Sequence, residues 1–144
     1  MIKIKVILCP IDYSKGSLAA LDYAVHFALR EAAKLCLVHV IDVRYLEGYT
    51  PSEVANPDSE TINRMKEELG KRVPEEVRKK VGVETIVTVG IPVVEIINAA
   101  KEKGADVIIM GTHGRTGIAH VIMGSVAENV VRRSPCPVLT VRQP

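Results

Sequence analysis

The stretch "ADVIIMGTHGRTGIAHVIMGSVAENVVRR", residues 105–133, joins a short apolar run to a glycine-rich segment and then to a helical pattern. The apolar run at 105–111 is nearly continuous, which is typical of a central parallel strand covered on both faces. Four of the chain's ten glycines fall between Gly111 and Ser125. Either this segment is a long flexible connection, or its glycines let the backbone close around a bound molecule.

Four further runs have the composition of β-strands, and they lie at residues 4–10, 35–43, 83–90 and 137–141. The run at 4–10 is also almost continuously apolar, which places it in the centre of a sheet. The run at 83–90 alternates more between apolar and polar residues, so we expect one of its faces to be wetter.

Helical patterns separate these runs. Apolar residues recur every three or four positions between residues 18 and 32, and Ser14 is placed to cap the start of that helix. A second apolar stripe covers residues 62–77 and is interrupted by Pro74. A proline inside a helical pattern predicts a kink or two shorter helices.

Pro92 suits the first position of a third helix, and a fourth is expected to start after Gly124 and to end before Ser134. Strands and helices therefore alternate along the whole chain, which predicts an α/β fold with one parallel sheet and helices on both faces. The common five-stranded arrangement is the flavodoxin-like order 3-2-1-4-5. We expect residues 1–144 to form a single domain.

Composition excludes several function classes. The net charge is +2, with one Phe and no Trp, so neither a basic surface nor stacking aromatics indicates nucleic-acid binding. The first ten residues lack the apolar length of a signal peptide or membrane span. The three cysteines show no metal-ligand spacing, so we expect no metal held by side chains, and buried reduced thiols predict a cytoplasmic protein.

In a sheet of this order, ligands bind beyond the carboxyl ends of the strands where the order reverses, between the first and fourth strands. The segment "CPIDYS" follows the first strand, and the glycine-rich segment follows the fourth. Gly111 and Gly114 would allow positive φ angles and close backbone approach to a ligand. Gly124 and Ser125 would open a helix whose free N–H groups could hold phosphate oxygens.

Polar side chains surround these glycines. His113 and Arg115 add reach toward an anion, and Asp12 would accept a ribose hydroxyl or bind a metal ion. A structural role is equally open for each residue, because Ser125 could be only a helix cap and Asp12 could simply begin a turn. His26 and His39 are interpreted as packing residues, on a helix and on a strand. His120 belongs to the glycine-rich loop or caps it.

With Pro10, Asp12 and Ser14 as a P-x-D-x-S start and "VLTV" at 138–141, the chain resembles the universal stress protein family along essentially its whole length. Nucleotide-binding members of that family carry the motif G-x2-G-x9-G-[S/T]. In this chain the motif reads Gly111, Gly114 and then, after nine residues, Gly124 and Ser125. Family members without these glycines do not bind ATP, so the resemblance implies the binding class.

The resemblance implies ATP, with Mg²⁺, as the ligand of this crevice. The residues it places beside the adenosine are Pro10, Ile11, Asp12, Val40, Met110 and Gly111, with Asp12 near the ribose and the Val40 backbone at the adenine. The residues it places along the phosphates are Gly114, Arg115, Gly124, Ser125 and Val126. His113 and Arg115 depart from the residues often found there. Family dimers often pair their last strands, here Val138 to Val141, as an exposed edge would invite.

The leading functional hypothesis is a small ATP-binding sensor or switch in stress physiology, in which nucleotide orders residues 112–123 and 44–57 and an unidentified protein partner reads the result. The alternative is a weak ATPase or a nucleotide-dependent transferase, although the chain has no GxxxxGK[ST] lysine. A phospho-accepting receiver domain is disfavoured because the third strand ends "TVGIPVV", without an acid. A flavin carrier is disfavoured by the scarcity of aromatic residues.

Overall fold

The structure is a computed structural model that describes residues 1–46, 57–114 and 123–143. Five strands form one sheet, and these strands are β1 Val6–Pro10, β2 Lys34–Asp42, β3 Val83–Gly90, β4 Val107–Gly111 and β5 Val138–Val141. The helices are α1 Lys15–Glu31, α3 Ser59–Gly70, α4 Glu75–Arg78, α5 Pro92–Lys103 and α6 Ser125–Arg133, with a 3₁₀ turn η1 at Val43–Tyr45.

All strands of the sheet are parallel, and their order is β3-β2-β1-β4-β5. The predicted fold class and strand order are therefore confirmed. β1 and β4 lie side by side in the centre, with Ile7 opposite Val107 and Leu8 opposite Ile108. The order reverses between these two strands, so their carboxyl ends mark the expected binding crevice.

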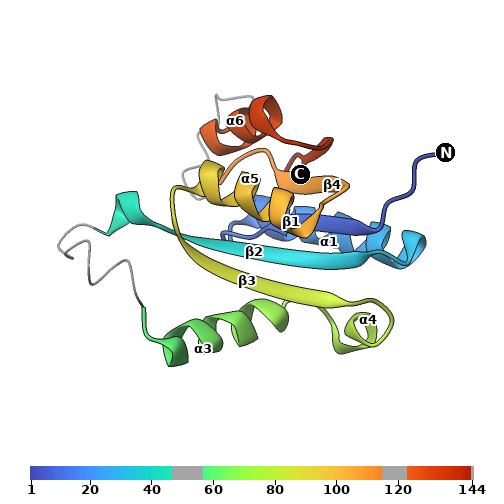
Figure 1. Cartoon of the computed structure of the whole chain (residues 1–144), viewed down its shortest axis with the longest axis horizontal. Coiled ribbons are helices and arrows are strands. Elements are labelled where there is room, and N and C mark those ends of the chain that lie inside the picture. The colour runs from blue at the N-terminus through green and yellow to red at the C-terminus, as the bar shows by residue number, and fades with distance from the viewer. Residues whose placement is uncertain (47–56, 115–122, 144) are drawn as a thin grey trace.

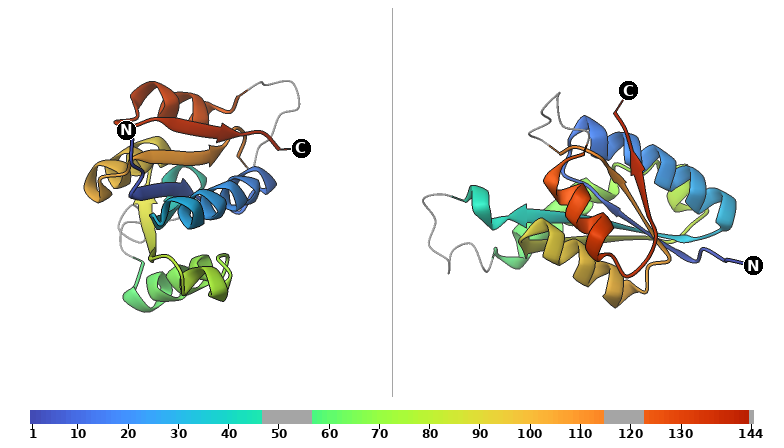
Figure 2. Two further views of the ribbon diagram at one scale, coloured as in Figure 1. Left: turned by 90° about the vertical axis from the view of Figure 1, so that its right-hand side faces the viewer. Right: turned by 90° about the horizontal axis from the view of Figure 1, so that it is seen from above.

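The two faces of the sheet carry different helices, as the view from above shows (Figure 2). On one face, α1, α3 and α4 pack against Ile7, Cys9, Leu35 and Leu37. On the other face, α5 and α6 pack against Leu8. Successive side chains of one strand thus pack into the cores on opposite faces of the sheet. This explains why the central strands are apolar throughout.

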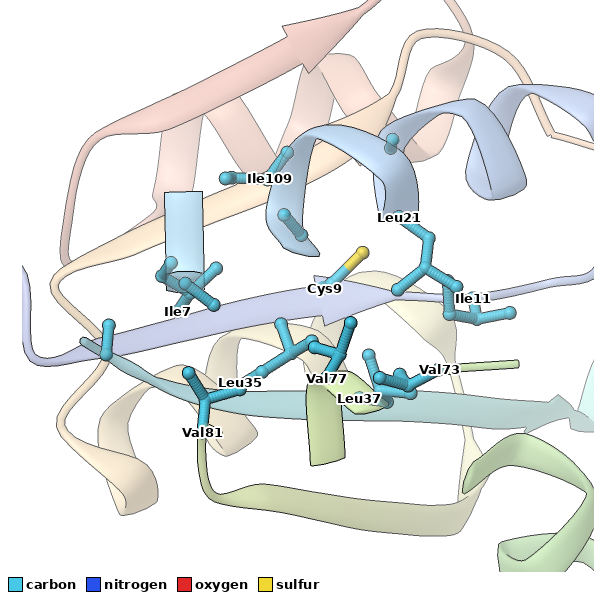
Figure 3. Close-up of a cluster of buried hydrophobic side chains, with 14 of the residues drawn as sticks. Ile7, Cys9, Ile11, Leu21, Leu35, Leu37, Val73, Val77, Val81 and Ile109 are labelled. Carbon is cyan, nitrogen blue, oxygen red and sulfur yellow. The ribbon is translucent and has the colours of Figure 1, made fainter. Parts of the chain in front are cut away.

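The core on the α1 side is the larger of the two clusters (Figure 3). Alanines of α1, at positions 20, 24 and 28, are fully buried and let the helix lie close to β1. Val73 and Val77 close the same core beside Leu35 and Leu37 of β2, and both come from the segment around Pro74. As predicted, the proline divides the stripe into two helices, since α3 ends at Gly70 and α4 begins at Glu75.

The helix starts at Ser14 and Pro92 agree with those predicted from the sequence. The N–H of Ser17 donates to the Ser14 hydroxyl at 3.1 Å, so Ser14 caps α1 as predicted. Pro92 is the first residue of α5.

Cys9 and Cys36 are buried free thiols, and Cys136 is half-buried. Among the helices of the described segments, none combines the length and apolarity needed to cross a membrane.

Candidate functional site

The two segments singled out in the sequence meet at the carboxyl ends of β1 and β4. Asp12 and Gly114 are 102 positions apart in the chain. A Cβ added to Gly114 would lie 2.8 Å from Oδ2 of Asp12, so the carboxylate rests directly against the glycine backbone. The fold therefore brings an acidic side chain into the glycine-rich segment.

The start of α1 is packed just as tightly against the residues after β4. A Cβ on Gly111 would lie 2.7 Å from the carbonyl carbon of Gly16, and a Cβ on Gly16 would lie 2.7 Å from the carbonyl oxygen of His113. Real Cβ atoms do not approach backbone this closely, so both positions require glycine. The first turn of α1 therefore lies directly beside the expected crevice.

Gly124 closes the other end of the segment. Its N–H donates to the carbonyl of Thr112 at 2.6 Å, and a Cβ at this position would lie 3.0 Å from the same oxygen. The N–H of Thr112 donates in turn to the carbonyl of Val141 at 3.0 Å. The residues before and after the intervening stretch are thus fastened together at the end of β4 and β5.

The prediction that Gly111 and Gly114 take positive φ angles is wrong, whereas their predicted close approach to a ligand stays a prediction. Within the described segments the positive φ angles belong to Tyr13, Ala32 and Gly104, and not to Gly111 or Gly114. Gly111 is needed because the backbone of α1 occupies the space of its side chain, and Gly114 because the Asp12 carboxylate does. In this structure, contacts within the protein, and not the backbone conformation, require glycine at these two positions.

The turn after β1 is built from its own side chains. Oδ1 of Asp12 accepts from the N–H of Ser14 at 2.9 Å, and the N–H of Asp12 donates to Oγ of Ser17 at 3.3 Å. Between them Tyr13 takes a φ of 66°, an unusual value for a residue other than glycine. Asp12 does begin a turn, and the same turn presents its second carboxylate oxygen to Gly114.

Several predicted adenosine neighbours lie in the core. The side chains of Pro10, Ile11 and Met110 are buried, so a ligand in the crevice could reach these residues only through their backbone atoms. Val40 lies on β2 past Val38, the last residue that pairs with β1. The β2 backbone therefore continues beyond the end of its neighbour, along the crevice.

Where the sequence predicts phosphate contacts, α6 begins with Ser125, which is exposed, followed by Val126, which packs partly into the core beside α5. The interpretation of Ser125 as a helix cap is wrong, because Gly124 holds the capping position and makes no side-chain hydrogen bond. A first turn without a side-chain cap leaves backbone N–H groups that can bind an anion. Arg115 and His120 lie outside the described residues.

His113 also belongs to this arrangement. Its Nδ1 lies 3.0 Å from Oγ1 of Thr112, and its backbone carbonyl faces Gly16. At the carboxyl end of β2, Arg44 forms a bidentate pair with Asp42, with Nη2 2.6 Å from Oδ2 and Nε 2.9 Å from Oδ1, and these hydrogen bonds lower the pKa of that carboxyl. No group of three His, Cys, Asp or Glu side chains in the described segments could hold a metal ion.

The sequence alone did not reveal the contacts of Gly16 and Ser17 at this site, or the hydrogen bond of His39. Gly16 was a detectable signal, since glycine is unfavourable within a helical pattern. Ser17 gave none, because its hydrogen bond depends on the turn. His39 was correctly interpreted as packing on a strand, but its Nδ1 also lies 2.7 Å from the carbonyl oxygen of Ile11.

Comparison with known proteins agrees with this architecture. The sequence model of the universal stress protein family matches residues 3–142. The universal stress protein MJ0577 of Methanocaldococcus jannaschii is 36% identical over 155 residues, covering 96% of this chain and 95% of the relative. YxiE of Bacillus subtilis is 38% identical over 150 residues, covering 94% and 97%.

Solved structures of universal stress proteins superpose on this fold. A structure of MJ0577 superposes with a TM-score of 0.78 at 36% identity over 99% of both chains. A universal stress protein in complex with cAMP has a TM-score of 0.70 at 28% identity, covering 99% of this chain and 100% of that one. One from Archaeoglobus fulgidus in complex with dAMP has a TM-score of 0.63 at 25% identity, covering 97% and 98%. In sequence and in fold, the chain belongs to the universal stress protein family.

Proposed function

We propose that this protein binds an adenine nucleotide, with ATP as the expected ligand, between the carboxyl ends of β1 and β4. The observation that carries the proposal is the contact of the Asp12 carboxylate with the Gly114 backbone at the point where the strand order reverses. The relatives that hold cAMP and dAMP support the ligand class, because both ligands contain adenine and phosphate.

Each part of the nucleotide has a proposed partner. Asp12 would accept a hydrogen bond from a ribose hydroxyl, and the backbone of Val40 would meet the adenine. Backbone N–H groups at Gly114 and Ser125 would bind the phosphates, where the start of α6 favours negative charge. Gly124 would line the phosphates without donating, because its N–H is bonded to the carbonyl of Thr112. Mg²⁺ would arrive with the nucleotide, since it needs few protein ligands when phosphates supply the others.

Calorimetry with Mg-ATP, ADP and AMP tests the proposal, with Gly114→Val as the disabling variant. A side chain at Gly114 would displace the Asp12 carboxylate, which lies 2.8 Å from the added Cβ. We expect wild-type protein to bind and Gly114→Val to lose at least tenfold in affinity, about 1.4 kcal/mol. The matched control is Gly82→Ala, whose Cβ would make only an ordinary 3.7 Å contact with Lys34.

Absence of heat with all three nucleotides in the wild type would refute the proposal, and so would equal binding by Gly114→Val. Phosphate release measured in the same samples distinguishes binding from hydrolysis. Turnover of several molecules per second, lost on His113→Ala, would instead support the alternative of an ATPase.

We further propose that nucleotide binding is read by a protein partner, which makes the chain a sensor or switch. Most of residues 112–123 and 44–57, whose ordering by nucleotide the sequence predicts, lies outside the described residues. The proposal is supported by a site formed from two separate segments, because a ligand that contacts both would favour one arrangement of them. Cross-linking capture in the presence and absence of ATP would test it.

A homodimer formed through β5 is proposed as the assembled state. β5 is an edge strand, so one side of its backbone is open to another chain. Leu139, in the middle of that strand, is 38% exposed, which is high for a leucine in a sheet. Pairing two such edges would bury both leucines and satisfy both rows of backbone groups.

A further inference from the structure

The peptide unit that joins Ile11 to Asp12 is held at both of its polar ends. Its carbonyl lies 2.7 Å from Nδ1 of His39 on β2, and its N–H donates to Oγ of Ser17 on α1 at 3.3 Å. A peptide unit is planar, so fixing its carbonyl and its N–H fixes its rotation about the chain. The direction in which Asp12 leaves the backbone is thereby set by two other elements.

The hydrogen bond from His39 has only one possible polarity. A carbonyl oxygen accepts but cannot donate, so Nδ1 of His39 carries a proton. His39 is only 7% exposed, and leaving a buried carbonyl without a hydrogen-bond partner is unfavourable because water cannot replace that partner. The bond therefore constrains the Ile11–Asp12 peptide far more than an exposed histidine would.

Ring contacts complete the arrangement around the same turn. The ring of Tyr13 lies 5.0 Å from the ring of His39, centroid to centroid, with an interplanar angle of 53°. The guanidinium carbon of Arg72, which follows α3, lies 5.1 Å from the centre of the Tyr13 ring. These contacts accompany the φ of 66° at Tyr13, a conformation that costs free energy unless its surroundings hold it.

We propose that His39 is a positioning residue for the nucleotide site: its Nδ1–H fixes the Ile11–Asp12 peptide, and Tyr13 against its ring holds the turn, so that Asp12 is aimed at a ribose hydroxyl. This inference rests on the proposed function. It makes the recognition of the ribose by Asp12, as distinct from that of adenine or phosphate, depend on a buried histidine.

Two variants separate the effect of the Nδ1–H donor of His39 from the effect of its ring. His39→Phe keeps a ring beside Tyr13 and removes the proton donor, whereas His39→Asn places an amide N–H near the position of Nδ1 and removes the ring. His26→Phe is the matched control, because His26 is an exposed histidine on α1. The readout is the affinity for ATP, 2′-deoxyATP and 3′-deoxyATP, measured by calorimetry, together with thermal unfolding of each variant.

We expect wild-type protein to bind ATP about tenfold more tightly than one of the two deoxynucleotides, the value of one hydrogen bond to a charged acceptor. His39→Phe should weaken ATP binding about tenfold and remove that discrimination, while binding of the poorer deoxynucleotide changes little. His39→Asn should retain most of the discrimination, and His26→Phe should retain all of it.

An equal loss for ATP and for both deoxynucleotides in His39→Phe would overturn the inference and leave the proposed function standing. A wild-type protein that binds no nucleotide overturns both. Nitrogen NMR of the ligand-free protein is an independent check, because it reports which ring nitrogen of His39 is protonated; protonation at Nε2 alone would overturn the inference. If His39→Phe does not fold, His39→Leu, which also lacks the donor, replaces it in a double-mutant cycle with Asp12→Asn, and additive losses of ATP affinity would contradict the inference.

Discussion

At Gly16 the backbone of α1 passes so close to the end of β4 that a methyl group has no space. Gly16→Ala would place a Cβ 2.7 Å from the carbonyl oxygen of His113, and that oxygen belongs to backbone that cannot rotate away. We expect a loss of about 1–3 kcal/mol in the free energy of unfolding, the usual cost of overpacking. Urea denaturation measures it.

Gly82→Ala serves again as the control, since its new Cβ meets only Lys34 at 3.7 Å and should change stability by less than about 0.5 kcal/mol. Equal stability of the two variants would mean that α1 can shift away from β4 at no cost. A shift of that kind should then appear as weaker nucleotide binding in Gly16→Ala.

Between elements, Glu84 is the residue that joins β2, β3 and α5. Its carboxylate accepts from Lys103 at 2.5 Å and pairs with Lys34 at 2.5 Å, and these hydrogen bonds lower its pKa from 4.5 to about 2. A carboxyl with a lowered pKa in the folded state stabilises the protein above its unfolded pKa and loses that effect as the pH falls toward the folded value. The stabilisation is thus present at pH 7 and disappears between about pH 4.5 and pH 2.

Glu84→Gln should therefore lower the free energy of unfolding by about 1 kcal/mol at pH 7, a value reduced for the solvent screening of side chains that are about one-third exposed. The difference from wild type should narrow as urea titrations are repeated from pH 7 down to pH 3. Glu68→Gln is the control, because its pair with Lys71 is more exposed. A difference that is constant with pH would contradict this explanation.

The elements themselves were largely readable from the sequence, because their signals are local. Pro74 and Pro92 marked helix boundaries, Ser14 marked a cap, and the two continuous apolar runs marked the central strands. The site was readable only in part. The spacing of the glycines identified the segment, but the reason for Gly111 lies in the backbone of Gly16, and such a contact has no local signal.

For the whole molecule, the proposed dimer through β5 gives a prediction about mass. Leu139→Lys would place a charge at the middle of the paired edges, and two such charges would face each other across a two-fold axis. We expect light scattering after size exclusion to give about twice the 15.7 kDa chain mass for the wild type and the single-chain mass for Leu139→Lys.

Leu29→Lys is the matched control, since Leu29 is 39% exposed and belongs to α1 rather than to β5, and this change should leave the dimer intact. A monomeric wild type, or a dimeric Leu139→Lys, would rule out this interface. The fold alone does not require pairing, because every strand of the sheet already has a partner within the chain.

The contact between Asp12 and Gly114 has a consequence for the order of folding. The segments that meet there are 102 positions apart, so the crevice cannot exist while only the first three strands have paired. It requires β4 to dock beside β1, which closes a long stretch of chain at a cost in entropy. A nucleotide bound there would recognise only finished molecules, and its main kinetic effect would be to slow unfolding rather than to hasten folding.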